Sequence, residues 1–312
     1  MLRAAFISQN QGPAPSGGGG GQSALDAVEL AALMELSAGK PEISIGLIDG
    51  PVVTDHPDLT IGHIREVHGK LGSACVRKDS AACQHGTFVA GIFSAKRGSP
   101  APAICPDCTL LVRPVFTETE PGDLEQPSAE PGELTAAILA CIEAGARVLN
   151  LSLALMQPST QAKRTLFEAL DHAARRGVVI VAAAGNQGTV GSTVITGHPW
   201  VIPVAACGLS GKPLNESNLG HSIGRHGLRA PGEQIMSLGA EGEPLTLGGT
   251  SAAAPFVTGA IALVWSQFPS LSAAQIRFAF VHADARARTN VTPPLLNAWA
   301  AYQLLLATHS RR

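Results

Sequence analysis

Three polar side chains stand at the ends of apolar runs, and together they have the types needed for nucleophilic catalysis. Asp49 ends the run ISIGLID, His85 opens the segment HGTFVAGI, and Ser251 opens the run SAAAPFVTGAIALVW. A serine hydroxyl is a weak nucleophile until a neighbouring base such as histidine takes its proton, and a carboxylate can hold that base in the right tautomer. The residue types therefore predict a Ser–His–Asp site, provided that the fold brings the three together.

Each of the three also has an ordinary structural explanation when it is taken alone. An aspartate after a strand commonly forms a turn or caps a helix, an isolated histidine is usually structural, and a serine before a helix is a preferred N-cap. Capping does not account for the Gly-Gly-Thr that precedes Ser251. A helix N-terminus, moreover, favours negative charge that develops beside it. The combination therefore favours chemistry over capping.

The apolar runs that must position these residues alternate between strand and helix character. Short runs rich in Val, Ile and Leu predict buried strands, and longer runs with helical spacing predict helices between them. The predicted strands cover residues 43–49, 109–116, 147–155, 177–185 and 200–207, and the predicted helices cover 23–38, 133–146, 160–176 and 252–267. This alternation predicts an α/β fold with a parallel sheet covered on both faces, whose ligands bind beyond the carboxyl ends of the strands.

The composition is that of a globular protein with one large domain. Hydrophobic residues make up 45% and charged residues 15%, the net charge is −2, and no basic stripe indicates nucleic-acid binding. Gly, Pro, Ser and Gln at 11–22 predict a disordered tail over 1–22, followed by one domain over 23–306 and a short tail over 307–312. Without a signal-peptide core or a run of about 20 apolar residues, we expect a cytoplasmic protein with no membrane partner, or a secreted one if a leader has been removed.

Taken together, the motifs DG (49–50), HGTFVAG (85–91) and GTSAAAP (249–255) resemble the three signatures of the subtilase family of serine peptidases, peptidase family S8. Their order, Asp then His then Ser, is the subtilisin order. The resemblance extends over roughly residues 43–282. It implies a three-layer α/β/α fold around a mostly parallel sheet. It also implies a serine endopeptidase that acts on peptide or protein substrates, with Asp49, His85 and Ser251 as its triad.

The resemblance also gives roles to residues outside the three motifs. VAAAGNQG (181–188) is similar to the segment whose asparagine completes the oxyanion hole, which places that role on Asn186. LNLSLA (149–154) resembles the strand that pairs with the substrate backbone, and AAG (183–185) resembles a wall of the S1 pocket. The substrate-binding residues implied in this way are Leu151, Ser152, Leu153, Ala154, Ala183, Ala184, Gly185 and Gly197. Ala154 stands where family members usually have glycine, so a narrower S1 entrance is expected.

The sequence also departs from the common pattern of the family. DGP stands where D[ST]G is usual, Phe88 replaces a common second histidine, and only about 40 residues precede the first predicted strand. With the cysteines, these features resemble the proteases of cyanobactin-type ribosomal-peptide pathways, which remove leader or follower peptides. Only 35 residues separate Asp49 from His85, too few for the helical insertion of the macrocyclising relatives, so hydrolysis is predicted. The alternatives are a general intracellular degradative subtilase and a catalytically silent binding module with the same fold.

Six cysteines raise the question of disulfides and metals. CPDC (105–108) is a lone CxxC, and zinc is disfavoured there because a structural zinc site needs further ligands. The remaining alternatives are a local disulfide, Cys75–Cys83 or Cys105–Cys108, and buried thiols acting as small hydrophobes at Cys141 and Cys207. No cofactor or metal is needed for the predicted catalysis. Structural calcium is common in the family, but no acidic loop of this sequence assigns a site.

The segment 117–134 carries six acidic residues and no Lys or Arg. A solvated loop is the simpler interpretation of such a charge run. In the family, the loop at this place borders the S2 and S4 subsites. We therefore expect a preference for basic residues at one of those substrate positions.

Overall fold

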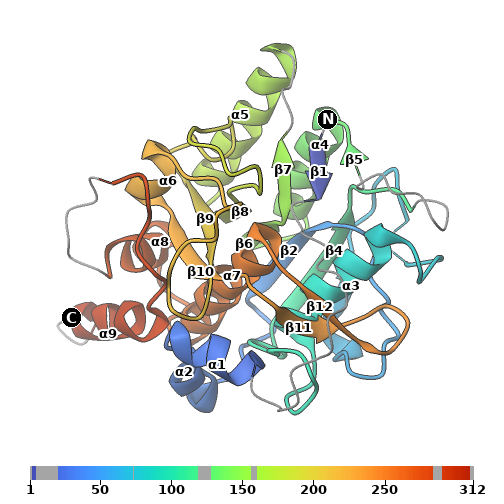
Figure 1. Ribbon diagram of the computed structural model, residues 1–312, viewed down its shortest axis with the longest axis horizontal. Helices are drawn as coiled ribbons and strands as arrows, with labels where there is room; N and C mark the ends of the chain where they lie inside the picture. The colour runs from blue at the N-terminus through green and yellow to red at the C-terminus, as the bar shows by residue number, and fades with distance from the viewer. Residues whose placement is uncertain are drawn as a thin grey trace.

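The computed structural model describes residues 2–4, 20–72, 74–118, 128–155, 160–283 and 290–309. Its centre is a seven-stranded sheet with the order β10-β9-β8-β6-β2-β4-β3, and every neighbouring pair is parallel (Figure 1). The strands are β2 (Ser44–Asp49), β3 (Ile64–Glu66), β4 (Thr109–Pro114), β6 (Val148–Leu151), β8 (Val179–Ala183), β9 (Val201–Cys207) and β10 (Leu228–Pro231). Their apolar runs are continuous because helices cover both faces.

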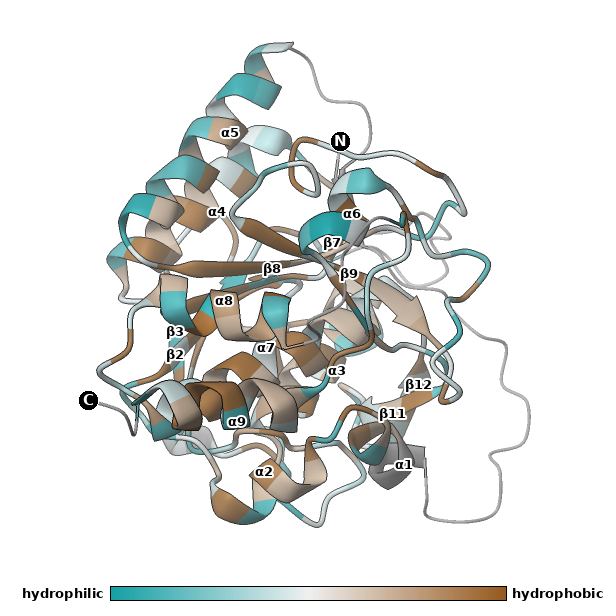
Figure 2. Ribbon diagram, turned by 90° about the vertical axis from the view of Figure 1, so that its left-hand side faces the viewer, coloured by the Kyte–Doolittle hydropathy of each residue, from teal (hydrophilic) through white to brown (hydrophobic). Residues whose placement is uncertain are grey.

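Two helical layers enclose this sheet (Figure 2). One layer holds α4 (Pro131–Glu143) and α5 (Thr160–Arg175), which pack with one hydrophobic cluster. The other layer belongs to the larger cluster, and its helices are α1 (Gly20–Ala27), α2 (Ala31–Leu36), α3 (Ala81–Ser94), α7 (Thr250–Gln267), α8 (Ala273–His282) and α9 (Ala298–His309). The three-layer α/β/α fold predicted from the sequence is confirmed.

Smaller elements complete the described chain. The 3₁₀ turn η1 (Ile61–His63) lies between β2 and α3, and the short helix α6 (His221–His226) precedes β10. β11 (Ile235–Leu238) and β12 (Pro244–Leu247) form an antiparallel hairpin before α7. β5 (Ser128–Ala129), β1 (Leu2–Ala4) and β7 (Leu153–Leu155) form a separate antiparallel sheet with β1 in the middle. No helix in the described ranges has the length and apolar character needed to cross a membrane.

Three local expectations differ from the structure. The single helix expected over 23–38 is interrupted at Glu29, whose φ of 55° is left-handed. Val28 and Leu30 are both fully buried, and in one continuous helix they would face nearly opposite sides. The strand expected over 147–155 divides into β6 and β7 at Ser152. Finally, Leu2–Ala4 forms β1 within the expected tail over 1–22, whose residues 5–19 lie outside the described chain.

Helix α7 owes its central position to its sequence. Its first six residues, TSAAAP, are small, and all residues from Thr250 to Ser266 are buried. A helix that is apolar and small on every side can lie between other layers of a domain instead of on its surface. The sequence GTSAAAP therefore places the first turn of α7, with Ser251, inside the protein.

Candidate active site

Asp49 is the last residue of β2, a central strand of the sheet, and it is completely buried. Its Oδ1 accepts hydrogen bonds from the backbone N–H of Gly50 at 2.7 Å and from Nδ1 of His85 at 2.6 Å. Within the described chain, its Oδ2 has no hydrogen-bond partner. The carboxylate is therefore directed at the histidine through one oxygen.

His85 lies in the second turn of α3, close to the helix N-terminus. Ser80 caps the helix by accepting the backbone N–H of Cys83 at 3.2 Å. The helix also packs directly against the turn after β2: a Cβ added at Gly50 would lie 2.0 Å from the carbonyl of Ala82, and one added at Gly86 would lie 2.3 Å from the carbonyl of Pro51. Glycine at both positions lets α3 approach closely enough for His85 to reach Asp49.

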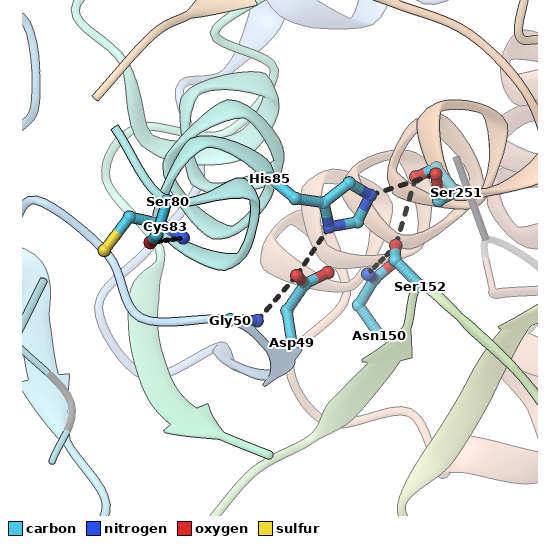
Figure 3. A network of polar contacts seen from close by, with 8 residues as sticks. All are labelled: Asp49, Gly50, Ser80, Cys83, His85, Asn150, Ser152 and Ser251. Atoms are coloured by element: carbon cyan, nitrogen blue, oxygen red, sulfur yellow. Dashed lines mark hydrogen bonds and ion pairs between the residues drawn. The ribbon is translucent and has the colours of Figure 1, made fainter. Parts of the chain in front are cut away.

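Ser251 is the second residue of α7, and its Oγ lies 3.1 Å from Nε2 of His85 (Figure 3). All three polar side chains are buried, with exposures of 0% for Asp49 and 1% for His85 and Ser251. Because Nδ1 of the imidazole donates to the carboxylate, Nε2 carries the lone pair that faces the hydroxyl. This is the geometry of a nucleophile with its general base and the group that orients the base.

The carbonyl of Ser251 is bound by a second polar network. Pro255, four residues further along α7, has no N–H to donate to it. The hydroxyl of Ser152 donates to this carbonyl instead, at 3.1 Å (Figure 3). Nδ2 of Asn150 donates to the same hydroxyl at 2.8 Å, and Thr258 donates to Oδ1 of Asn150 at 2.8 Å. The end of β6 is thereby fixed to the first turns of α7.

Asn186 lies in the loop after β8, next to the start of α7. Its Oδ1 accepts from both the backbone N–H and the hydroxyl of Thr250, each at 2.9 Å. The backbone N–H of Gly185, whose φ is 103°, donates to the same hydroxyl at 3.1 Å. With its oxygen held by Thr250, the amide carries its donor Nδ2 on the opposite side, as an oxyanion donor requires.

The residues expected to bind substrate occupy different environments. Leu151 and Leu153 are buried in the cluster below α4 and α5, so they present only backbone to a ligand. Ala183 and Ala184 are buried at the end of β8, directly before the loop that carries Asn186. The backbone N–H of Gly197 donates to the carbonyl of Thr193 at 2.8 Å, within a separate turn. The structure thus brings residues 183–185 close to the start of α7, whereas Gly197 belongs to a separate turn.

Two further expectations concern the substrate channel. The backbone of Ala154 pairs with Arg3, whereas its side chain lies outside the described structure. Of the acidic segment 117–134, residues 119–127 also lie outside the described chain. Two of its acids serve the protein itself: Glu118 accepts the backbone N–H groups of Val76 and Arg77 at 2.8 and 3.0 Å, and Glu133 forms an ion pair with the buried Arg113 at 2.5 Å.

The cysteines divide into one disulfide and four thiols. Cys75 and Cys83 are joined, whereas Cys105, Cys108, Cys141 and Cys207 are free and buried. Burial raises the pKa of the Cys141 thiol to about 12 and that of Cys207 to about 11. Among the described residues, the one group of His, Cys, Asp or Glu side chains close enough to share a metal ion comprises Cys75, Cys83 and Glu118. Its two sulfurs are already bonded to each other.

Sequence reasoning named the three central residues and Asn186 but missed the side chains that hold them. Thr250, Asn150 and Thr258 were given no role, although each donates or accepts a hydrogen bond in the networks around Ser251. Thr250 stands next to Ser251 in the motif GTS, which was a signal that could have been used. The link between Asn150 and Thr258 spans 108 residues, so no local pattern could have disclosed it.

The fold and the site define a class of protein: a hydrolase with three α/β/α layers, in which buried Asp, His and Ser side chains lie together at the carboxyl ends of parallel strands. The model of the family described as "Subtilase family" matches residues 40–297. The chain belongs to this family. It is therefore a serine endopeptidase that acts on peptide substrates, and catalysis in this class needs no cofactor.

Known relatives and structures agree with this assignment. The chain is 30% identical to subtilisin DY of Bacillus licheniformis over 241 residues, which cover 75% of this chain and 81% of that protein. It is also 30% identical to subtilisin E of Bacillus subtilis over 244 residues, 75% of this chain and 58% of that protein. A mutant of the protease domain of PatA aligns with a TM-score of 0.78 at 29% identity, covering 86% and 97% of the two chains. The prenylagaramide maturation protease PagA aligns with a TM-score of 0.76 at 27% identity, covering 88% and 98%.

Proposed function

We propose that Asp49, His85 and Ser251 are the catalytic triad of this endopeptidase. The observation that carries the proposal is the continuous relay from Oδ1 of Asp49 to Nδ1 of His85 and from Nε2 to Oγ of Ser251, at 2.6 and 3.1 Å. Oγ attacks the scissile carbonyl while Nε2 takes its proton, and the imidazolium later gives that proton to the leaving amine. In the second half of the reaction, Nε2 takes a proton from a water molecule that attacks the acyl-enzyme carbonyl, and the imidazolium returns the proton to Oγ as the carboxylic acid product leaves.

Two donors stabilise the tetrahedral intermediate in this proposal. They are Nδ2 of Asn186 and the backbone N–H of Ser251 in the first turn of α7. The positive end of the α7 dipole adds to their effect on the developing oxyanion. Support comes from the way Thr250 holds Oδ1 of Asn186, because this contact fixes the direction of the amide before substrate arrives.

The triad is tested with a fluorophosphonate probe, which phosphonylates an activated serine. The wild type should be labelled, and Ser251→Ala should not. Ser266→Ala is the matched control, because Ser266 is a second buried serine of α7, and among the described residues its hydroxyl contacts only the carbonyl of Ala262, to which it donates at 2.8 Å, and Sγ of Cys108, at 3.7 Å. Labelling of Ser251→Ala at the wild-type rate, or a wild type that resists the probe, would contradict the proposed triad.

We propose further that the substrates are precursor peptides from which a leader or follower segment is removed. Support comes from the likeness to the patellamide maturation protease PatA and to PagA, which reaches 29% and 27% identity over most of the chain. The described connection between β2 and α3 supports hydrolysis over cyclisation, because it contains only η1 and β3. A general degradative role, as in the subtilisins, is the second candidate, favoured by identities of 30%.

These two candidates are separated by digestion of a diverse peptide pool, with cut sites mapped by mass spectrometry. A processing enzyme should cut few sequences at defined positions and leave denatured casein largely intact. Extensive casein digestion with little sequence preference would favour degradation and contradict processing. The same data show whether basic residues are preferred beside the acidic segment 117–134, a preference that salt should weaken.

A further inference from the structure

The first turn of α3, the loop before it and the start of the acidic segment 117–134 meet at three side chains that are able to bind a metal ion. Cys83 is the third residue of α3, Cys75 lies in the preceding loop, and Glu118 is the first acid of the segment. Two sulfurs and a carboxylate oxygen of these residues all lie within 4.8 Å of one another. Two ligands of one tetrahedral zinc ion are about 3.5–3.8 Å apart, so the three groups are close enough to share an ion.

The disulfide between Cys75 and Cys83 does not account for the position of Glu118. Oε1 of Glu118 lies 2.6 Å from Sγ of Cys83. A sulfur in a disulfide carries no proton to share with a carboxylate, whereas a thiol can donate one, and a metal ion can be bound by the sulfur and the oxygen together. The position of Glu118 therefore suits the reduced cysteines better than the oxidised pair.

Both Glu118 and Cys83 are held by contacts that do not depend on the disulfide. The backbone N–H groups of Val76 and Arg77 donate to Oε1 of Glu118 at 2.8 and 3.0 Å. Ser80 accepts the backbone N–H of Cys83 at 3.2 Å and so fixes the first turn of α3. Metal-binding carboxylates commonly have such hydrogen bonds, which orient them before the ion arrives. The two ligands therefore keep their places when the disulfide opens.

The disulfide is accessible to a reductant from the side of the loop. Cys75 is partly exposed and its neighbour Val76 is 81% exposed, whereas Cys83 is fully buried. A dithiol reductant therefore attacks Sγ of Cys75, and Cys83 leaves as a thiolate near the N-terminus of α3, which favours negative charge. The second thiol of the reductant then displaces Cys75 and closes a disulfide within the reductant. Two electrons and two protons pass to the protein, which keeps both cysteines as thiols.

We propose that Cys75, Cys83 and Glu118 bind one thiophilic divalent cation, such as Zn²⁺, when the disulfide is reduced. Binding displaces the two thiol protons and leaves the fourth position of a tetrahedral ion to water. Thiolates select soft cations of this kind, whereas calcium and magnesium require oxygen ligands. The bound ion links the loop, the first turn of α3 and the acidic segment, so it replaces the link that the disulfide provides under oxidising conditions.

This metal site is separate from the candidate active site, although a single residue lies between Cys83 and His85. The sulfur of Cys83 is directed away from His85 (Figure 3). The contacts of His85 with Asp49 and Ser251 involve neither cysteine. Reduction and metal binding should therefore leave the rate at which Ser251 reacts with a fluorophosphonate close to that of the oxidised chain.

The test uses the full chain, reduced with a phosphine and then desalted without oxygen or metal. Titration with Zn²⁺ against a chromophoric chelator should show one ion bound per chain, and Co²⁺ should give a thiolate-to-metal charge-transfer band. The oxidised chain should show neither, and an excess of Ca²⁺ should not compete, because two of the three ligands are sulfur. Failure of the reduced chain to bind one ion, or equal binding by the oxidised chain, would overturn the proposal.

Two variants remove ligands. Cys75→Ala should abolish Zn²⁺ binding and the Co²⁺ band. Glu118→Gln keeps the disulfide and an oxygen for the N–H groups of Val76 and Arg77, which keeps the test valid if Cys75→Ala folds poorly. It should raise the Kd for Zn²⁺ by at least about tenfold, the smallest loss that follows removal of a group which merely supports a metal ligand.

Two matched substitutions serve as controls. Cys108→Ala removes a buried free thiol of the CPDC segment, and Glu130→Gln removes an exposed acid from the same acidic segment. Both should retain the Kd of the parent. Binding that survives Cys75→Ala but is lost in Cys108→Ala would place the ion at CPDC and overturn the proposal, as would equal losses in Glu118→Gln and Glu130→Gln.

Fluorophosphonate labelling of the same samples distinguishes this proposal from the proposed function. If the reduced chain binds Zn²⁺ as expected but no form of the protein is labelled, the metal site stands and the proposed triad fails. If Ser251 is labelled in every form but the reduced chain binds no Zn²⁺, the triad stands and the metal site fails.

Discussion

Two buried histidines in the described part of the chain are each paired with an aspartate, and only one of the two pairs has the geometry of the proposed triad. His85 and Asp49 are 1% and 0% exposed and lie 2.6 Å apart at the carboxyl end of the sheet. His198 is also 1% exposed, and its Nε2 lies 3.2 Å from Oδ1 of Asp171, a half-exposed residue of α5. A buried imidazole with a carboxylate partner is therefore not in itself evidence of an active site.

The decisive difference is which ring nitrogen faces the carboxylate. In His85 the carboxylate faces Nδ1, which leaves the basic Nε2 directed at Ser251. In His198 the carboxylate faces Nε2, and Nδ1 accepts the backbone N–H of Trp200 at 3.3 Å. The lone pair of His198 therefore accepts a backbone hydrogen bond, as in a structural residue. A histidine that can act as a base is therefore recognised by the ring nitrogen that does not face the carboxylate, which must be directed at the hydroxyl.

The largest expected effect separates the two histidines by activity. His85→Ala should lower kcat by about 10⁶-fold, the loss that accompanies the equivalent change in subtilisin, a relative of this protein. His198→Ala should leave kcat within about twofold, because its partners are a surface carboxylate and a backbone amide. Steady-state kinetics on the peptide substrate, with circular dichroism to verify folding, measures both. Comparable losses of kcat in His85→Ala and His198→Ala would contradict the assignment of the general base to His85 alone.

A smaller effect is expected from the carboxylates. Asp49→Asn should lower kcat by about 10⁴-fold, because an amide in this place stabilises the wrong imidazole tautomer. Asp171→Asn is the matched substitution in the other pair and should keep kcat close to that of the parent. The same kinetic assay applies. Retention of activity in Asp49→Asn would show that the buried carboxylate does not orient the base.

Asn186 tests whether the site around His85 includes an oxyanion donor. Asn186→Ala should lower kcat by about 10²–10³-fold with little change in KM. Asn186→Asp distinguishes the donor from the anchor, because it keeps an oxygen for Thr250 but loses the N–H that faces the intermediate. Recovery of activity in the aspartate variant would mean that the contact with Thr250, and not the donor, is what matters.

The smallest effect concerns stability and belongs to His198. Burial lowers the pKa of His198 below its ordinary value, and the hydrogen bond and charge of Asp171 oppose only part of this shift. Between the folded pKa and about 6.5, the unfolded chain binds a proton that the folded chain does not. The free energy of unfolding should therefore fall as the pH drops below about 6.5.

Urea unfolding at several pH values measures this dependence. His198→Gln should reduce the slope of the free energy of unfolding against pH by the contribution of one proton, which is at most about 1.4 kcal/mol per pH unit. Part of the dependence should remain in the variant, because burial also lowers the pKa of His56. An identical pH dependence in the parent and in His198→Gln would show that the pKa of His198 is the same in the folded and the unfolded chain.

Much of the fold followed from local pattern. The apolar runs predicted β2, β4, β8 and β9, as well as α4, α5 and α7, because continuous burial and helical spacing are recorded in consecutive residues. The short elements β1, β3 and β5 were not predicted, since two or three residues carry no periodicity. The interruption of the helix at Glu29 was also not predicted, because it depends on the burial of Val28 and Leu30 by residues elsewhere in the protein.

The sequence by itself determined the chemistry of this protein. The motifs around Asp49, His85 and Ser251 define the family, and the small residues before Pro255 define the buried helix that carries Ser251. These are local properties of short stretches, so they are recorded in the sequence alone.

Only the tertiary structure decided how the groups face one another. The tautomer that distinguishes His85 from His198, the donor that reaches the carbonyl of Ser251 and the place of β1 between two strand edges all depend on residues far apart in the chain. Hydrogen-bond direction arises from the packing of whole elements, and spacing along a sequence does not record it.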